Sequence, residues 1–288
     1  MKDLNYQLSK LCRDNRDGSF STQATRSRIL DLIASQLPAL GFRRMQPRSL
    51  KPKHIDALVT HWQEQGIGIG TLKNRLSALR WWAKKVNKPS IIAKDNDVYG
   101  IGMRTGVAKE SKSLKLDEKK LSAISDQNAR LSIRLQAAFG LRREESIKFS
   151  PSYAMQGGHI KLKPSWTKGG RARTVPIRND EQRQLLDEVK EFAKGGALIP
   201  AQLNYVQQLN RYQRQLRNVG FSKLHGLRHA YAQQRYLELT GWQAPVAGGP
   251  TSKQLTPEQL GPDYDARVIV SRELGHARVE IAVVYLGR

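Results

Sequence analysis

The sequence predicts a two-domain, mostly α-helical protein whose second domain adds a small β-hairpin. The chain has 288 residues, and a domain usually holds about 100–200 residues. Apolar residues recur at helical spacing along most of the chain, and strand-like alternation appears only between residues 160 and 177. A Lys-, Gly- and Ser-rich stretch at 88–120 separates the two patterns. We expect four regions: a flexible N-terminus (1–20), a helical domain (21–105), a linker (106–115) and a mixed α+β domain (116–288).

Three helices account for the first domain. Apolar residues at helical spacing predict helices at 22–37, 54–65 and 71–86. In the third helix one face is apolar, and Lys73, Arg80 and Lys84 lie together on the flank that points away from it. Such a helix can bury one face and offer the other to phosphates or base edges. A merely solvated basic face is the alternative interpretation.

The second domain mixes helices with two strands. A helix over 121–139 ends at Gly140, and further helices are expected at 180–193, 201–219 and 227–239. The two strands, around residues 160–162 and 175–177, flank a Gly-Gly pair and therefore predict a hairpin. Residues 241–262 contain four prolines and four glycines, which indicates an inserted loop. A last helical stretch is expected over 278–285.

The charge of the chain points to a polyanionic partner. Lys and Arg number 49 against 25 Asp and Glu, which gives a net charge of +24. Residues 1–110 hold 20 basic and 9 acidic residues, and 111–288 hold 29 and 16, so the excess is not a terminal tail. Because 39% of the residues are hydrophobic, the chain can build a core and is not a disordered basic segment. Nucleic acid is the favoured partner, and a solvated basic surface is the alternative.

Several classes of protein are excluded or disfavoured. No run of about 18 apolar residues exists, so a membrane-spanning helix is not expected, and the first residues do not resemble a signal peptide. The single cysteine, Cys12, can form neither an internal disulfide nor a cysteine metal cluster. His225 and His229 lie one helical turn apart but lack the acidic partners of a zinc motif, so a structural pair is preferred. We expect a cytoplasmic protein without metal or cofactor.

A series of basic and nucleophilic residues occurs in a distinctive order. Gly140-Leu141-Arg142 has an acid, Glu145, three residues after the arginine. Further along the chain the series continues with Lys168 before the Gly-Gly pair of the hairpin, His225 and Arg228 one helical turn apart, Leu274-Gly275-His276, and Tyr285 nine residues later. Each element alone is weak evidence, but five in this order, with the His-to-Tyr spacing matched, are specific.

This order resembles the tyrosine recombinases, the phage-integrase and Xer-like site-specific recombinases. The resemblance covers about 121–288 by motif and 20–105 by organisation, and the insertion at 241–262 is most similar to integrases of bacterial mobile elements. It implies a helical SAM-like core-binding domain followed by an α+β catalytic domain, which together close on duplex DNA as a C-shaped clamp.

Two features depart from the family pattern. Phe139 stands where the family often has Thr, and only three residues follow Tyr285, where many relatives extend a helix to a neighbouring subunit.

The resemblance also implies a role for each residue. Tyr285 would attack a DNA phosphate to give a 3′-phosphotyrosine and a free 5′-hydroxyl. Arg142 and Arg228 would bind the non-bridging oxygens, and Lys168 would protonate the leaving oxygen. His225 would bind the phosphate or assist proton transfer at the nucleophile, and His276 would donate to a non-bridging oxygen. Glu145 would hold the arginine or the local backbone.

Some neighbouring residues compete for these roles. Arg143 adjoins Arg142 but fails the spacing, and His229 is expected to pack beside the site. Lys161, Lys163 and Arg171 are near alternatives to Lys168. The rival tyrosines Tyr231, Tyr236 and Tyr264 are expected to be structural.

The implied partners are double-stranded DNA recombination sites and three further copies of the chain. The family exchanges strands through a Holliday junction as a homotetramer, and the free protein is expected to be a monomer. We expect it in the cytoplasm of a bacterium, associated with the nucleoid. Two other functions remain open: a type IB topoisomerase, which uses the same chemistry without partner exchange, and a non-catalytic, sequence-specific DNA-binding or architectural protein.

Overall fold

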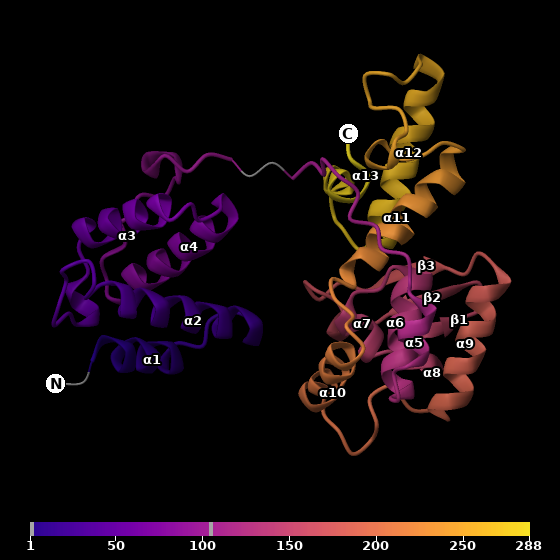
Figure 1. Cartoon of the computed structure of the whole chain (residues 1–288), viewed down its shortest axis with the longest axis horizontal. Coiled ribbons are helices and arrows are strands. Elements are labelled where there is room, and N and C mark those ends of the chain that lie inside the picture. Colours follow the sequence, from indigo (N-terminus) through magenta and orange to yellow (C-terminus); the bar gives the residue numbers. More distant parts are fainter. Residues whose placement is uncertain (1–2, 104–105) are drawn as a thin grey trace. The chain divides into compact units, whose positions relative to one another are not determined.

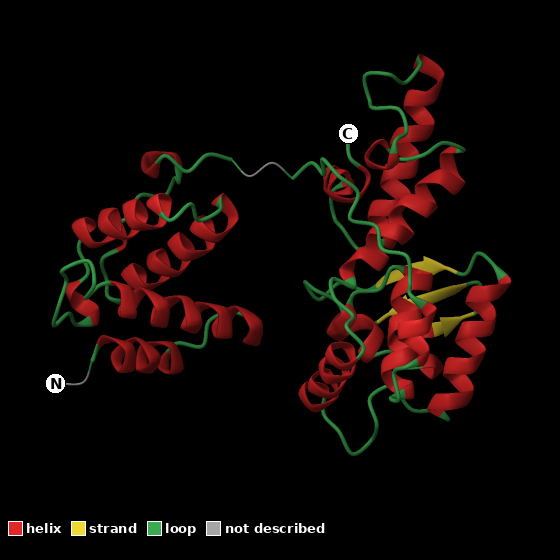
Figure 2. Cartoon of the chain, viewed as in Figure 1, coloured by secondary structure: helices red, strands yellow, loops and turns green. Residues whose placement is uncertain are grey.

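The chain forms two compact units, Met1–Thr105 and Gly106–Arg288. The computed structural model describes residues 3–103 and 106–288, so the domain boundary expected at residue 105 lies outside the described residues. The first unit is helical, and the second combines helices with one small sheet (Figures 1 and 2). The predicted fold class is therefore confirmed. No helix among the described residues is long and apolar enough to cross a membrane.

Within residues 3–103 the first unit contains four α-helices, which pack around two buried tryptophans. The helices are α1 (Leu4–Asp14), α2 (Phe20–Gln36), α3 (Pro52–Glu64) and α4 (Ile69–Lys85). Trp62 of α3 and Trp82 of α4 are fully buried. Each indole N–H finds an acceptor, because Trp62 donates to the side chain of Gln36 at 2.9 Å and Trp82 donates to the carbonyl of Pro47 at 3.0 Å. The core thus buries two large side chains without an unpaired polar atom on either.

The expectation of a flexible N-terminus over residues 1–20 is wrong for most of that segment. Helix α1 begins after Asp3, whose carboxylate accepts a hydrogen bond from the backbone N–H of Tyr6 at 2.8 Å. Leu4 and Leu8, one turn apart, are buried in the core of the unit. Asn5 donates to the carboxylate of Asp31 on α2 at 2.7 Å. Tertiary packing therefore orders a segment whose composition is mostly polar.

The Lys-, Gly- and Ser-rich stretch at 88–120, which the sequence predicts to separate the domains, is divided between the two units. Its first part contains two 3₁₀ turns, η2 (Pro89–Ile91) and η3 (Asp97–Tyr99), and buries Ile92 and Ile101 in the first unit. The expected linker, 106–115, instead lies against the second unit. Backbone hydrogen bonds of 3.1 Å join Ala108 to Val283 and Leu114 to Gly226.

The second unit contains the predicted hairpin within a three-stranded antiparallel sheet. The strands are β1 (Met155–Gln156), β2 (His159–Leu162) and β3 (Arg173–Pro176), in that order across the sheet. In the β2–β3 register Ile160 lies opposite Val175, and both are fully buried. Strand β1 was not expected, because two residues are too few to show an alternating pattern. The connection between β2 and β3 contains one 3₁₀ turn, η4 (Pro164–Trp166).

Nine α-helices complete the second unit in the part of the chain that is described. They are α5 (Glu118–Ser122), α6 (Gln127–Phe139), α7 (Arg143–Ile147), α8 (Pro151–Ala154), α9 (Asp180–Ala193), α10 (Tyr205–Asn218), α11 (His225–Thr240), α12 (Pro257–Glu273) and α13 (Val283–Leu286). The helix expected over 121–139 is split in two. Asp126 breaks it by capping α6, since its carboxylate accepts from the backbone N–H groups of Asn128 and Ala129.

Two expectations near the C-terminus need correction. The insertion 241–262 is not a loop throughout: after η5 (Pro245–Ala247) and a turn, helix α12 begins at Pro257, with Thr256 and Gln259 forming a capping box. The single helix expected over 278–285 is instead η6 (Val279–Ala282) followed by the short α13.

Candidate active site

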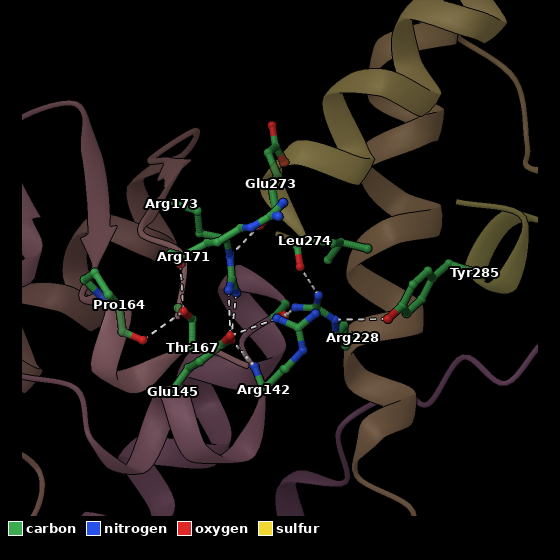
Figure 3. A network of polar contacts seen from close by, with 11 residues as sticks. Arg142, Glu145, Pro164, Thr167, Arg171, Arg173, Arg228, Glu273, Leu274 and Tyr285 are labelled. Atoms are coloured by element: carbon green, nitrogen blue, oxygen red, sulfur yellow. Dashed lines mark hydrogen bonds and ion pairs between the residues drawn. The ribbon is translucent and has the colours of Figure 1, made fainter. Parts of the chain in front are cut away.

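Arg228 of α11 lies at the centre of the polar site and connects three elements. Its side chain is 1% exposed. Nη1 donates to the carbonyl of Gly140 at 2.5 Å, Nη2 donates to the carbonyl of Leu274, and Nε donates to the hydroxyl of Tyr285 at 3.3 Å (Figure 3). Burial, and next the charge of Arg142, lower the pKa of Arg228 to about 10, so it stays charged at neutral pH. One buried cation therefore holds the ends of α6 and α12 against the tyrosine.

The glycine before the first arginine is required by local geometry. Gly140 ends α6 with a φ of 59°, in the left-handed region that favours glycine. A Cβ atom there would lie 2.6 Å from Cδ1 of Tyr231. Only glycine therefore allows the chain to turn here and to present the Gly140 carbonyl to Arg228.

Arg142 and Glu145 form the start of α7. The backbone N–H of Arg142 donates to Oε2 of Glu145 at 2.6 Å, and its Nη1 donates to Oε1 at 2.9 Å. The Glu145 side chain is fully buried, whereas that of Arg142 is 20% exposed. Burial alone would raise the pKa of Glu145, but the hydrogen bonds and charge of Arg173, with the charges of Arg228 and Arg142, outweigh it and lower the pKa to about 2. The carboxylate is thus ionised.

A third arginine, Arg173 of β3, belongs to this cluster and was missed in the sequence. Its Nη1 and Nη2 donate to the two carboxylate oxygens of Glu145 at 2.5 and 2.6 Å, and its Nε donates to the carbonyl of Glu273 at 2.9 Å (Figure 3). The sequence did contain a signal that Arg173 is buried, because it lies two residues before Val175 and therefore shares the inward face of the strand. A cation at a position that alternation assigns to the core needs a buried acid as a partner.

Tyr285 lies on α13 among three histidines. It is 5% exposed, and its ring centroid is 4.7 Å from that of His229, 5.7 Å from that of His276 and 6.3 Å from that of His225. Its carbonyl accepts a hydrogen bond from Gln233 Nε2 at 3.1 Å. The structure therefore brings together the predicted Arg142, Glu145, His225, Arg228, His276 and Tyr285.

The histidines around Tyr285 are held neutral. Burial first, and then the charges of Arg228 and Arg142, lower the pKa of His276 to about 4 and also lower that of His225. Burial lowers the pKa of His229 to about 4. Nε2 of His276 is buried and has no hydrogen-bond partner among the described residues. A neutral imidazole can donate one proton or accept one, which suits a group that contacts a phosphate oxygen or a phenol.

Lys168 is the predicted residue that the structure does not place in the cluster. It is exposed on the connection between β2 and β3, and makes no hydrogen bond or ion pair within the described ranges. Thr167, beside it, donates its hydroxyl to the carbonyls of Pro164 and Arg171 (Figure 3).

The predicted DNA-binding residues on α4 differ from one another. Lys73 is half-buried and Lys84 is exposed, and neither forms a hydrogen bond or ion pair in the described part of the chain. Arg80 is instead bound within its own unit, since Nε donates to the carbonyl of Ala93 at 2.9 Å and Nη2 donates to the side chain of Asn96 at 3.0 Å. The expectation that Arg80 faces DNA phosphates therefore needs correction.

The rival tyrosines have structural surroundings or lie outside the cluster. Tyr231 donates its hydroxyl to Glu273 at 2.6 Å, and Tyr236 donates to Asp263. Both phenols have a raised pKa, because burial and the neighbouring carboxylate disfavour the phenolate. Tyr264 is exposed on α12. Among the described residues no group of three or more histidine, cysteine or acidic side chains could hold a metal ion.

Comparison with protein families identifies the chain. A family model described as phage integrase, N-terminal, matches residues 1–89, and a second described as integrase matches residues 102–234. The chain belongs to the tyrosine recombinase (phage integrase) family. The integrase match ends before His276 and Tyr285, so these two residues rest on the motif and on the geometry above. No curated protein matches the chain.

Solved structures of tyrosine recombinases share the fold at low sequence identity. A lambda integrase(75-356) dimer bound to a COC′ core site is 18% identical, with a TM-score of 0.61 over 99% of this chain and 95% of that one. XerH bound to a palindromic difH substrate is 19% identical, with a TM-score of 0.59 over 99% and 81% of the two chains. A lambda integrase tetramer bound to a Holliday junction is 18% identical, with a TM-score of 0.60 over 99% and 77%.

Proposed function

We propose that this recombinase cuts and rejoins duplex DNA at specific sites through a covalent 3′-phosphotyrosine on Tyr285. The hydrogen bond between Arg228 and the Tyr285 hydroxyl carries this proposal, because it places a nucleophile on the cation that would bind the attacked phosphate. The buried position of Arg228 and its bonds to two backbone carbonyls hold that cation in one orientation. Preorganised charge of this kind is the main source of stabilisation for a transition state that gathers negative charge.

Arg228 and Arg142 have different roles at the scissile phosphate. Arg228 uses one N–H group on each of its three nitrogens to bind two carbonyls and the phenol, so it supplies a positive charge held in a fixed position and keeps two of its five N–H donors for the phosphate. Arg142 uses one side-chain donor on Glu145 and is partly exposed, which leaves guanidinium N–H groups free to bind the non-bridging oxygens. Neutral His276, whose Nε2 has no partner among the described residues, would donate to one of these oxygens.

The bonds and protons of the transfer step are all accounted for by the DNA and by side chains of this chain. The Tyr285 oxygen bonds to phosphorus, the bond from phosphorus to the 5′ oxygen breaks, and the phosphodiester is stored as a phosphotyrosine. The phenol proton passes to a nearby base, for which neutral His225 is suited. The 5′ oxygen takes a proton from Lys168, which must then move in from its exposed loop. The reverse reaction with a different 5′-hydroxyl rejoins the strand.

Strand exchange requires more than one copy of the chain. We propose that four copies assemble on two DNA sites and pass through a Holliday junction, and that the protein acts in the cytoplasm on bacterial DNA. The lambda integrase tetramer bound to a Holliday junction, which shares the fold, supports this assembly. The basic residues of both units supply charge for a DNA partner.

The decisive test is covalent capture of DNA by Tyr285. The protein is incubated with fragments of the DNA that flanks its gene, and fragments that remain attached after protein denaturation are sequenced. The site found is then rebuilt as a duplex with a nick beside the scissile phosphate, so that the cut strand diffuses away and the adduct accumulates. The wild-type protein should form the adduct, and Tyr285→Phe should not.

Tyr264→Phe is the matched control, because Tyr264 is an exposed tyrosine on α12. An adduct that persists in Tyr285→Phe, or a Tyr264→Phe variant as inactive as it, would refute the nucleophile assignment. Specific binding without any adduct would favour the non-catalytic alternative. Relaxation of supercoiled plasmids that lack the site would favour the topoisomerase alternative.

A further inference from the structure

All three nitrogens of the Arg173 guanidinium donate within the protein. Its side chain is 6% exposed, and Nε, Nη1 and Nη2 all donate to protein acceptors. It is therefore not placed to bind a phosphate in the way that the partly exposed Arg142 is. Its function must be sought in the groups that it holds.

The first of these groups is Glu145, which Arg173 shares with Arg142. Oε1 of Glu145 accepts from Nη1 of both arginines, at 2.5 Å from Arg173 and 2.9 Å from Arg142. Oε2 accepts from Arg173 Nη2 and from the backbone N–H of Arg142, both at 2.6 Å. Every oxygen that orients Arg142 is thus also fixed by the guanidinium of Arg173. Two parallel N–H···O bonds hold the carboxylate plane in one orientation, which a lysine cannot do.

The second group is the turn that carries His276. Nε of Arg173 donates to the carbonyl of Glu273 at 2.9 Å, and the next carbonyl, that of Leu274, accepts from Arg228. Gly275 follows with a φ of 71°, and a Cβ atom there would lie 2.9 Å from Cδ of Arg173. Arg173 therefore packs directly against the turn between α12 and His276, and the positive φ of Gly275 together with this close approach favours glycine in Leu274-Gly275-His276.

We propose that Arg173 is a positioning residue that fixes both Arg142 and His276 for contact with the non-bridging oxygens of the scissile phosphate. The inference rests on the proposed function and adds a residue to it. Arg173 comes from the sheet, Glu145 from α7 and the Glu273 carbonyl from the end of α12, so one side chain sets the relative position of three elements (Figure 3). Groups that support contacting residues in this way commonly change activity by about 10–100-fold when they are replaced.

The simplest alternative is that Arg173 only stabilises the fold. A buried carboxylate that loses its partner destabilises a protein, so any Arg173 variant is expected to lower the melting temperature. The test therefore compares two substrates on one folded variant. One substrate carries the normal scissile phosphate, and the other carries a methylphosphonate in which a methyl group replaces one non-bridging oxygen. The neutral linkage has less charge for Arg142 and His276 to stabilise, whereas the fraction of folded protein is the same for both.

Arg173→Lys keeps the charge but loses the paired hydrogen bonds. In single-turnover cleavage it should be about 10–100-fold slower than wild type on the phosphate, and within about threefold of wild type on the methylphosphonate. Arg142→Ala should show the same pattern. Arg235→Lys is the matched control. Nε of Arg235 donates to Oε1 of Glu273 at 3.0 Å, and no hydrogen bond or ion pair among the described residues joins Arg235 to Glu145. The Arg235→Lys variant should therefore cleave both substrates at the wild-type rate.

A second variant separates charge burial from positioning. Arg173→Met combined with Glu145→Gln removes the buried carboxylate that Arg173→Met alone would leave without its arginine, so the double variant should melt closer to wild type than Arg173→Met while remaining slow on the phosphate. An equal rate loss of Arg173→Lys on both substrates, or wild-type cleavage by the double variant, would overturn the assignment of Arg173. If the wild-type protein forms no adduct on the normal phosphate, the proposed function fails, and this assignment fails with it.

Discussion

At the scale of single residues, the site is organised by one buried carboxylate among three arginines. Glu145 orients Arg142 through a hydrogen bond of 2.9 Å and is itself clamped by Arg173. The third arginine, Arg228, is bound by main-chain carbonyls instead. An excess of buried positive charge is costly without a substrate, and a phosphodiester would supply the missing negative charge. The arrangement thus favours the phosphate group that the proposed chemistry requires.

Lys168 offers a prediction at this scale, because the structure leaves it exposed and outside the cluster. If it donates the proton to the leaving 5′ oxygen, Lys168→Ala should slow single-turnover cleavage by about 10²–10⁴-fold. In a substrate with sulfur in place of that bridging oxygen, the leaving group is a thiolate. A thiolate needs no proton to leave, because thiols are far more acidic than alcohols. Cleavage of the sulfur substrate by Lys168→Ala should therefore approach the wild-type rate.

Arg142→Ala serves as the comparison for Lys168, because it lacks a phosphate ligand and should stay slow on both substrates. Lys163→Ala tests the rival lysine that is nearest in the sequence; its ammonium already contacts an aromatic ring, since it lies 4.3 Å from the ring centroid of Tyr153 on α8. A Lys168→Ala variant that is equally slow on sulfur and oxygen would show that the lysine has another role.

The residues of the site were predictable only in part. The order of motifs singled out Arg142, Arg228, His276 and Tyr285, and the structure places them together. The order of motifs could not reveal Arg173, because the partner of a buried arginine depends on which helix packs on the strand. Nor could it distinguish Arg80 from Lys73 and Lys84: all three share a flank of α4, but only Arg80 is reached by the loop that carries Ala93 and Asn96.

At the scale of secondary-structure elements, the errors of prediction have physical causes. Helix α1 is polar on average, and it is stabilised by the burial of Leu4 and Leu8 and by the hydrogen bond from Asn5 to Asp31, which composition does not reveal. Proline-rich composition indicated a loop over 241–262, yet Pro257 occupies the first turn of α12, where a missing N–H costs nothing. Spacing alone suggested a regular helix before Tyr285, whereas Arg278 is extended and a 3₁₀ turn leads into α13. Long amphipathic helices such as α4 and α9 were predicted well because their pattern extends over several turns.

The junction between α6 and α7 gives a prediction for an element. Gly140→Ala places a side chain in the left-handed region, which costs about 1–2 kcal/mol, and presses it against Tyr231, which costs about 1–3 kcal/mol more. Gly157→Ala, in the β1–β2 turn, is the matched control, since Gly157 has a φ of 68° but no atom within 4 Å of an added Cβ. Thermal or denaturant unfolding should show a larger loss of stability for Gly140→Ala.

The same pair of variants also tests whether the junction positions Arg228. Because the Gly140 carbonyl accepts from Arg228, Gly140→Ala should slow cleavage even at temperatures where the variant is fully folded. Gly157→Ala should not. Equal effects of the two variants on both stability and cleavage would show that close packing on Tyr231 is unimportant.

At the scale of the whole molecule, the excess positive charge is shared by two units that differ in chemistry. The first unit contains none of the predicted catalytic residues, and its basic side chains can contribute affinity and register only. In the second unit a few arginines are committed to the buried site. Binding to DNA phosphates releases counterions, so each phosphate that is neutralised makes affinity fall more steeply with salt.

Helix α4 allows the contribution of its basic flank to be measured side chain by side chain. Lys73→Ala and Lys84→Ala should each reduce the slope of log affinity against log salt by about 0.9 for each phosphate that the lysine neutralises, with little change in melting temperature. Arg80→Ala should do the reverse: it breaks two hydrogen bonds inside the unit, which costs about 1–3 kcal/mol of stability, and leaves the slope unchanged. Affinity for a short duplex of unrelated sequence, measured across a salt series, separates the two classes. If Arg80→Ala flattens the slope as much as the lysine variants, its guanidinium leaves Ala93 and Asn96 to bind DNA.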